Sequence, residues 1–314
     1  MDTKNSLITF GQKLEPIDVI ATEPDWVQAR PTWIERALNR ALELPSGGWY
    51  VVGASRDIRN RPRRYRIDGR EYVAWLSRGQ PKVAPDACPH MAASLADGSV
   101  RNGHIVCPWH GLALEGERHG AWFPLPTFDD GVLVWVRLGS EDTATAQPVL
   151  PNRPVRYLDT VIRKDARCDP EDVIANRLDP WHGVHFHPHS FARLNVIEQT
   201  EDSITVRVVY RVFRRLGIEV DARFHCPEPR TIVMTIVAGE GTGSVVETHA
   251  TPIDPGRTAI IEATLATSER PQFHVLIGTF GGLLRRLVGW RAQKLWAEDA
   301  TYAERRYALR KGKA

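Results

Sequence analysis

Two short stretches of similar lettering decide the fold of this chain: CPHMAASL at residues 88–95 and CPWHGLAL at residues 107–114. In each, a histidine closely follows a Cys-Pro pair, so that one residue separates Cys88 from His90 and two separate Cys107 from His110. Thiolates and imidazoles at such short spacing are typical metal ligands. A zinc finger pairs its cysteines at one knuckle and its histidines on a helix, whereas here each loop supplies one of each. This distribution suits two adjacent irons, one bound by both cysteines and the other by both histidines.

The residues around these ligands also fit a cluster that is held by loops. Pro89 and Pro108 stiffen the two loops, and Gly111 is expected to let the backbone approach the metal. The stretch GAWFPLP at 120–126 is expected to form a third loop that shields the site. With sixteen residues between the two ligand pairs, the loops resemble the Rieske [2Fe–2S] domain, in which the two cysteines and two histidines bind the cluster.

The composition limits the class of protein. A length of 314 residues predicts two domains, and the formal net charge of +3 gives no case for binding nucleic acid. Four cysteines do not make a disulfide framework, and Cys168 and Cys226 are expected to be plain buried thiols. The first residues lack the pattern of a signal peptide, and no apolar stretch reaches the ~20 residues of a membrane span. These features favour a cytoplasmic, reducing setting.

Hydrophobic patterning divides the chain into three parts. Residues 1–44 are expected to be a helical lead-in that ends at a Pro-Ser-Gly-Gly stop. Residues 45–142 are predicted to form an all-β domain that holds the Cys-His loops, with a hairpin turn at Asp68-Gly69. After a Pro-rich linker, a helical segment around 169–187 precedes five alternating strands and a final helix within residues 150–314. The five strands are predicted at 203–213, 217–226, 231–239, 244–253 and 258–267.

A second candidate metal site lies in NRLDPWHGVHFHPHSF at residues 176–191. Asp179 and His182 are three residues apart and share a helix face, and His187 follows five residues later, so a bulge or a helix end must bring it round. Two imidazoles and one carboxylate with open coordination positions form the facial triad of non-haem Fe(II) oxygenases. A competing interpretation makes Asp179 and Pro180 a plain helix start. His185 is the alternative to His187 as a ligand.

Together the two motifs resemble the terminal oxygenase (alpha) subunit of the Rieske non-haem iron oxygenases, over about residues 45–314. The resemblance implies an α+β protein: an N-terminal all-β Rieske domain plus a C-terminal helix-grip catalytic domain, whose antiparallel sheet is covered by the C-terminal helix. It also implies that a carboxylate on that helix joins the two histidines as an iron ligand; Asp299 is chosen, and Glu298 is the alternative. Met91 departs from the pattern, because many members of the family have arginine there.

The resemblance further implies an assembly and a chemistry. The chain would form a homotrimer, in which Asp179 bridges a cluster histidine of one subunit, His110 or His90, to His182 of the next, with Asn176 close to the iron. A ferredoxin or a flavin reductase would supply electrons, NAD(P)H would act only through that reductase, and O2 would be the co-substrate. The expected reaction oxidises an apolar small molecule, such as an isoprenoid or carotenoid, a steroid or an aromatic compound. Monooxygenation is favoured over dioxygenation, desaturation and demethylation.

An alternative from another class is a Rieske-type electron carrier whose C-terminal domain only binds a lipid or a partner. Two basic stretches suggest where the chain could contact an electron donor or a membrane. Seven arginines between Arg56 and Arg70 could steer an acidic electron donor, or they could form a solvated hairpin face. The basic amphipathic stretch at 274–296 could make peripheral contact with a membrane, or it could simply cover the sheet.

Overall fold

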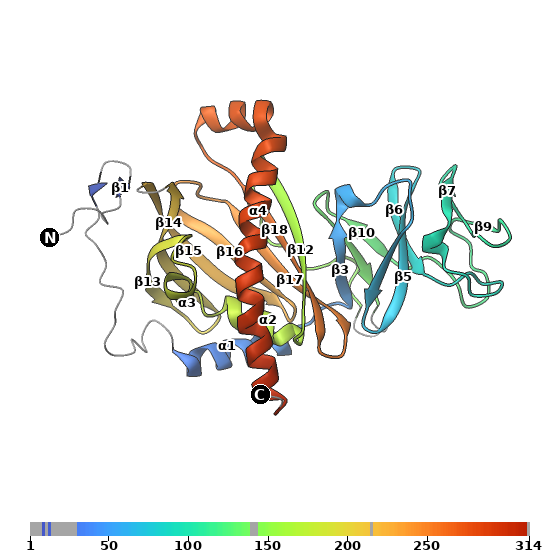
Figure 1. The fold of residues 1–314 in the computed structure, drawn as a ribbon, viewed down its shortest axis with the longest axis horizontal. Helices are drawn as coiled ribbons and strands as arrows, with labels where there is room; N and C mark the ends of the chain where they lie inside the picture. Colours follow the sequence, from blue (N-terminus) through green and yellow to red (C-terminus); the bar gives the residue numbers. More distant parts are fainter. Residues whose placement is uncertain (1–7, 10–11, 14–29, 139–143, 214–215, 313–314) are drawn as a thin grey trace.

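The N-terminal all-β domain consists of three small antiparallel sheets, at the right of Figure 1. The computed structural model describes residues 8–9, 12–13, 30–138, 144–213 and 216–312. The first sheet has the order β10 (Thr127–Asp129), β11 (Leu133–Arg137) and β3 (Trp49–Ala54). The second has the order β4 (Arg63–Ile67), β5 (Arg70–Ser77) and β6 (Gln80–Pro85). The third has the order β7 (Ser99–Arg101), β8 (His104–Val106) and β9 (Ala113–Leu114).

The predicted helical lead-in is only partly helical. Helix α1 (Pro31–Glu43) begins at a proline, which suits the first helical position, and buries Trp33 and Leu38 in the core of the second domain. Two short strands, β1 (Ile8–Thr9) and β2 (Gln12–Lys13), take the place of helix further upstream, and β1 pairs with β15 (Leu216–Glu228). The other residues of the predicted lead-in before position 30 lie outside the described residues.

The second domain is built on a large antiparallel sheet. Its path runs β12 (Leu158–Ala166), β18 (Arg257–Ala266), β17 (Val245–Asp254), β16 (Thr231–Gly239), β15, β14 (Ser203–Phe213) and β13 (Phe191–Gln199). The five strands predicted from alternation correspond to β14 to β18. β17 and β18 are buried almost continuously, because one face packs in the core of this domain and the other against the first domain. The predicted α+β class and helix-grip arrangement are confirmed.

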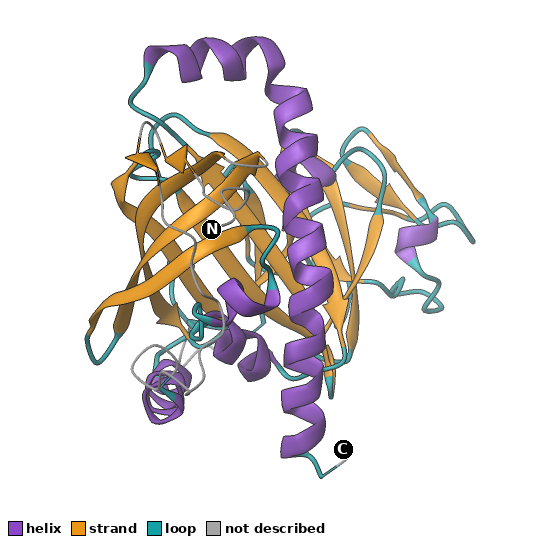
Figure 2. Cartoon of the chain, turned by 60° about the vertical axis from the view of Figure 1, so that its left-hand side comes forward, coloured by secondary structure: helices purple, strands orange, loops and turns teal. Residues whose placement is uncertain are grey.

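One long helix crosses this sheet, as Figures 1 and 2 show. Helix α4 (Pro271–Arg310) packs along β12 and over α2 (Pro170–Arg177). Small residues at Ala292, Ala300 and Ala303 let the helix approach the layer beneath, and Trp296 fills the space between them. The first turns of α4 bend away and project past the end of the sheet in both figures. Among the described residues, none of the helices combines the length and apolarity needed to span a bilayer.

The two domains share a hydrophobic core. Trp49 and Trp135 of the first domain pack with Ile261 and Leu265 of the second in one buried cluster. A buried ion-pair network lies beside it: Arg153 contacts Asp130 of the first domain at 2.8 Å and Glu247 of β17 at 2.5 Å. Burial of both apolar and charged groups at this junction fixes the domains relative to each other.

Candidate functional site

The two Cys-His loops have the same backbone hydrogen bonds. The amide of Ala92 donates to the carbonyl of Cys88 at 2.8 Å, and the amide of Gly111 donates to that of Cys107 at 3.0 Å. In return, each cysteine amide donates to the carbonyl five residues later, in Ala93 or Leu112. Ala92 and Gly111 both have positive φ, of 57° and 73°. The similar lettering therefore encodes one loop conformation used twice.

Gly111 suits this conformation. A Cβ atom at Gly111 would meet no protein atom within 4 Å, whereas the left-handed φ is a conformation that L side chains rarely adopt. Ala92 adopts the same conformation at a steric cost. The turn by itself therefore favours glycine at position 111, and close approach of the backbone to the cluster stays a prediction.

The loops bring the four predicted cluster ligands together. Cys88 and Cys107 are buried in one core cluster with Trp75 and Trp122, and the Trp122 indole donates to the carbonyl of Pro85 at 3.0 Å. The imidazoles of His90 and His110 lie outside this core, with their Nδ1 atoms 3.3 Å apart. Two inner thiols and two outer imidazoles fit the unequal iron ligation of a Rieske cluster.

The thiols are electrostatically different. Burial raises the pKa of the Cys88 thiol. Burial acts in the same direction on Cys107, but hydrogen bonds from the backbone of Trp109 and His110 and from the Cys88 thiol outweigh it and lower the pKa of Cys107. Amides that point at sulfur stabilise the thiolate, which is the form that binds a metal.

The second predicted site is assembled by α3 (His182–Phe186) and α4. Asp299 lies between the two histidines: its Oδ1 is 3.0 Å from Nε2 of His182 and 2.7 Å from Nε2 of His187. The candidate ligand atoms all lie within 4.8 Å of one another. Two imidazoles and a carboxylate around one point are the donor set of a facial triad, so the residues fit a mononuclear iron.

The local backbone explains how His187 reaches this point. The helix predicted around 169–187 is broken between α2 and α3, because Pro180 lacks an N–H and disfavours helical geometry at Asp179. His187 caps the end of α3 and turns inward, whereas His185 is exposed and packs on Trp181. The structure therefore places His187, and not His185, beside Asp299.

Neighbouring groups orient both imidazoles. Nδ1 of His182 contacts the backbone carbonyl of Asp179, and Nδ1 of His187 lies 2.5 Å from Oε2 of Glu298. Each histidine therefore presents Nε2 to Asp299. Such outer contacts fix the tautomer and the ring angle of a metal-binding histidine. Glu298, weighed from the sequence only as a replacement for Asp299, lies instead on the far side of His187.

Asp299 is buried and electrostatically stabilised. Burial by itself would raise its pKa, but hydrogen bonds from His182 and His187 outweigh this and lower the pKa below its usual value. Ion pairs from Arg306 and Arg310 to the buried Asp172 hold α4 against α2, two or three turns beyond Asp299. These contacts set the position of Asp299 along α4.

Asn176 and Asp179 lie beside this triad. The Nδ2 atom of Asn176 is 3.4 Å from Oδ1 of Asp299, and the Tyr302 hydroxyl donates to Asp179 at 3.5 Å. Among the described residues, Oδ1 of Asn176 and Oδ1 of Asp179 are buried without hydrogen-bond partners. Burial raises the pKa of Asp179. Tyr302 is missing from the sequence predictions, although its position one turn after Asp299 on the same helix could have indicated it.

A cavity of about 330 Å³ opens from the triad. It is enclosed by α2, α3, α4 and the strands β13 to β18, and most of its wall is apolar. Residues on the wall include Phe191, Leu194, Val206, Val208, Phe224, Met234, Ile236, Val246 and Trp296. The arrangement is an apolar chamber with a metal-binding triad in its wall, which is the form of a small-molecule site.

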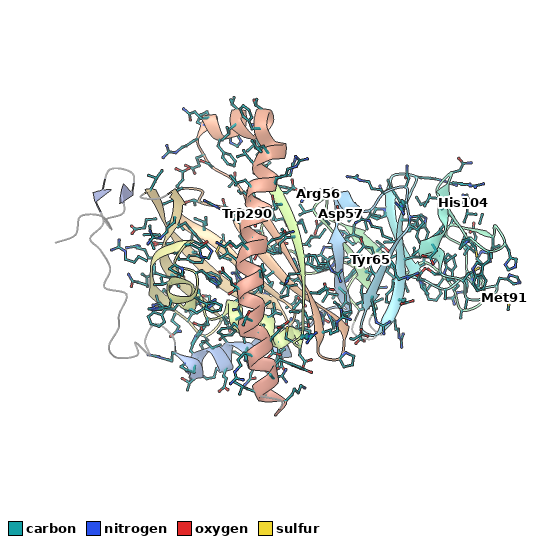
Figure 3. The ribbon with its side chains drawn as sticks, in the orientation of Figure 1. Arg56, Asp57, Tyr65, Met91, His104 and Trp290 are labelled. Carbon is teal, nitrogen blue, oxygen red and sulfur yellow. The ribbon has the colours of Figure 1, made fainter. Side chains whose placement is uncertain are left out.

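The arginine-rich stretch runs from the domain junction toward the first cluster loop, where Arg64 donates a hydrogen bond to the Ser94 hydroxyl at 2.6 Å. Figure 3 places Arg56 near the junction of the domains, and Met91 of the first cluster loop at the far end of the molecule. Arg56 pairs with Asp159 at 2.8 Å, and Arg66 pairs with Asp254 at 2.7 Å, so both link the two domains. Arg63 and Arg64 pair with carboxylates within the first domain. Four of the seven arginines are therefore paired with carboxylates, and the idea that the stretch steers an electron donor stays a prediction.

Comparison with known proteins identifies both domains. The family model for the Rieske [2Fe-2S] domain matches residues 48–134, and the model described as a domain of unknown function (DUF5914) matches residues 139–314, more than half of the chain. The chain is 25% identical to the oxygenase component of dicamba O-demethylase from Stenotrophomonas maltophilia, over 50% of this chain and 52% of that protein. It is 34% identical to aminopyrrolnitrin oxygenase from Pseudomonas fluorescens, over 27% of this chain and 22% of that protein. Thus the chain spans about half or less of the length of these curated relatives.

Solved structures agree on the fold. Dicamba monooxygenase bound to dicamba superposes with a TM-score of 0.65 at 20% identity, over 85% of this chain and 90% of that one. The terminal oxygenase of carbazole 1,9a-dioxygenase from Nocardioides aromaticivorans superposes with a TM-score of 0.58 at 14% identity, over 91% and 90%. The chain has a Rieske [2Fe–2S] domain and the fold of Rieske non-haem iron oxygenase terminal subunits. It belongs to the DUF5914 family.

Proposed function

We propose that the chain is the terminal oxygenase component of a Rieske-type system, which uses O2 and electrons from a separate donor to oxidise an apolar small molecule, with monooxygenation favoured. The observation that supports it best is the meeting of His182, His187 and Asp299 in the wall of an apolar cavity, in a chain that also has a Rieske domain. An iron ion at the triad would activate O2, and the cluster would deliver electrons singly.

The residues of the chain have distinct roles in this proposal. Cys88, Cys107, His90 and His110 hold the cluster. His182, His187 and Asp299 would hold the iron in the cavity wall, where it would supply the activation of O2 beside a bound substrate. The apolar cavity wall excludes water, which protects the reaction from side paths.

Metal content and oxygen uptake test this proposal. Purified protein should contain about three irons per chain, from a two-iron cluster and one mononuclear site. Chemically reduced protein should consume O2 faster when a suitable substrate is added, so a panel of aromatic, steroid and isoprenoid compounds should contain a stimulator. About two irons per chain and no stimulation by the panel would favour the Rieske-type electron carrier instead.

We also propose that the working unit is a homotrimer in which electrons cross between chains. Within one chain the cluster loops and α3 lie on opposite sides of the α4 helix and the domain junction (Figures 1 and 3). His90 and His110 are exposed beside Met91 and Trp109, each 63% exposed, which suits docking to another protein surface. Asp179, whose buried Oδ1 has no hydrogen-bond partner within the part of the chain that the structure describes, is the proposed contact for a neighbour's cluster histidine.

A mixing experiment tests the crossing of electrons. Cys107→Ser removes a cluster ligand and Asp299→Ala removes an iron ligand, so each variant alone should be inactive. Co-assembled chains should recover activity, because an intact cluster of one chain can serve the intact iron of another. A mixed trimer that stays inactive would contradict the proposal, and size-exclusion chromatography with light scattering would show whether trimers form at all.

We further propose that α4 makes peripheral contact with an anionic membrane surface. Apolar side chains project from its first half into solvent, among them Val275 at 70%, Leu283 at 67% and Trp290 at 61% exposure (Trp290 is labelled in Figure 3). Every charged residue between positions 271 and 297 is basic. An exposed apolar face with only positive charges is typical of helices that lie in the headgroup region of anionic bilayers.

Vesicle binding tests the membrane contact. The chain should co-sediment with vesicles that contain phosphatidylserine and less with pure phosphatidylcholine. The double variant Leu283→Glu/Trp290→Glu should lose binding, whereas Met91→Glu, an equally exposed apolar position in the other domain, should keep it. Binding unchanged by the double variant would contradict the proposal.

A further inference from the structure

The cavity wall contains charged side chains that the metal site does not use. Three arginines line it: Arg177 at the end of α2, Arg211 on β14 and Arg291 on α4. The acidic residues on the same wall are Glu262 of β18 and Asp299. Asp299 already contacts His182 and His187, so its charge is committed to the triad. The rest of the cavity therefore has more positive than negative groups.

Arg177 has an unusual environment for a guanidinium group. Its Nε atom is buried without a hydrogen-bond partner, and none of the hydrogen bonds or ion pairs among the described residues involves its side chain. Its guanidinium carbon lies 5.6 Å from the ring of Phe224 and 5.8 Å from that of Trp296. The aromatic faces stabilise the cation and hold it in place, but they satisfy none of its N–H donors.

Glu262 does not act as the hydrogen-bonding partner of Arg177. Its Oε2 accepts a hydrogen bond from the Trp296 indole at 2.7 Å and a longer one from Thr248 at 3.5 Å. Burial raises the pKa of Glu262, which favours the uncharged acid, although the nearby Arg177 acts in the opposite direction. The donors of Arg177 are therefore available to a group that enters the cavity.

We propose that Arg177 is a specificity-determining residue that binds an anionic group, of the carboxylate class, on an otherwise apolar substrate. A planar guanidinium binds a carboxylate with two parallel hydrogen bonds, and such bonds are strongest where water is excluded. Arg177 directly follows Asn176, which contacts Asp299, so an anion held there would place the apolar body of the substrate within the chamber beside the triad. The substrate class becomes an apolar acid rather than a neutral hydrocarbon.

This inference deepens the proposed function because it takes the cavity as the substrate site. Its test, however, measures binding and needs no turnover. The probes are 2-naphthoate and 2-naphthamide, which have the same shape and differ in charge. Binding to the iron-loaded wild-type chain is measured by isothermal titration calorimetry. We expect naphthoate to bind at least about tenfold more tightly than naphthamide.

Variants identify the group responsible. Arg177→Gln should weaken naphthoate binding about tenfold and change naphthamide binding less than about twofold, whereas Arg177→Lys should retain part of the preference. Arg223→Gln, an exposed arginine on β15 outside the cavity, is the matched control and should change neither affinity.

Several results would overturn the proposal: equal binding of the two probes, binding of neither, or a preference for naphthoate that Arg177→Gln leaves intact. The last would place the carboxylate on the metal or on another arginine. The chain could instead fail to take up mononuclear iron and still bind naphthoate more tightly than naphthamide in a way that depends on Arg177. That result would contradict the proposed oxygenase function and leave this inference standing.

Discussion

The two candidate metal sites of this chain are built in opposite ways. The cluster site comes from two loops that are close in sequence, is shaped by backbone hydrogen bonds, and leaves its histidines exposed. The triad joins His182 and His187 to Asp299 of α4, more than a hundred residues later, and is shaped by side-chain contacts, with His187 and Asp299 buried and His182 half-buried. A local site depends on its own loop, whereas a non-local site depends on the packing of the whole domain.

The sharpest test of this comparison removes the carboxylate that joins α3 to α4. Asp299→Ala should abolish substrate-dependent oxygen uptake, a loss of at least about 100-fold, because a triad without its carboxylate loses the metal. The visible absorption and the electron paramagnetic resonance of the reduced cluster should persist. Retained turnover would move the third ligand elsewhere, and loss of the cluster signal would show that the two sites are not independent.

A second test breaks the junction between the domains. Arg153→Met leaves Asp130 and Glu247 buried without their cation, and this should lower the free energy of unfolding by about 3–5 kcal/mol. Denaturant unfolding followed by tryptophan fluorescence measures the change. Cluster absorption below the transition should match wild type, since the loops are held by their own hydrogen bonds. A variant that folds but cannot hold the cluster would contradict the local character of that site.

The same network predicts a pH dependence. Burial opposes ionisation of Asp130 and Glu247, but hydrogen bonds donated by Arg153 to both and by His249 to Glu247 lower the pKa of each carboxyl below its ordinary value, 3.8 for Asp130 and 4.5 for Glu247. Their stabilising contribution is therefore complete above about pH 4.5 and is lost as the pH falls below these values. Arg153→Met should remove this part of the acid sensitivity. Denaturant midpoints of wild type and Arg153→Met, measured between pH 3 and 7, test this. Midpoints that fall in parallel in the two proteins as the pH is lowered would contradict the assignment.

A smaller effect is expected from the contact that orients His187. Glu298→Gln replaces a carboxylate that faces Nδ1 by a neutral amide, so iron affinity should fall about 10- to 100-fold without loss of the fold. Competition with a chelator measures the affinity. Glu304→Gln, on the same helix and outside the triad, is the control. An affinity that drops as far as in Asp299→Ala would make Glu298 a direct ligand.

The smallest effect compares the two cluster loops with each other. Ala92→Gly should stabilise the first loop by up to about 1 kcal/mol, and Gly111→Ala should destabilise the second by about 1 kcal/mol, because both positions have left-handed φ. The denaturant midpoint for loss of cluster absorption reports both changes. Effects of the same sign would show that the two loops are not equivalent.

The sequence by itself determined the features that depend on neighbouring residues. The Cys-Pro-His and Cys-Pro-x-His spacings set the cluster loops, and alternation set strands β14 to β18, because backbone conformation and face periodicity are local properties. The sequence raised a helix end before His187 and a helix start at Asp179-Pro180 without deciding between these and one helix over 169–187. The short strands β1 and β2 lacked any periodicity long enough to detect.

Only the tertiary structure decided which of the competing side chains meet. The sequence favoured His187 and Asp299 as iron ligands and kept His185 and Glu298 as alternatives. The packing of α4 on α2 brings His187 and Asp299 together. The same packing places Arg177 between Phe224 and Trp296 in the cavity. These contacts join residues distant along the chain, and they form only when burial of the whole sheet and helix layer offsets the entropy of bringing them together.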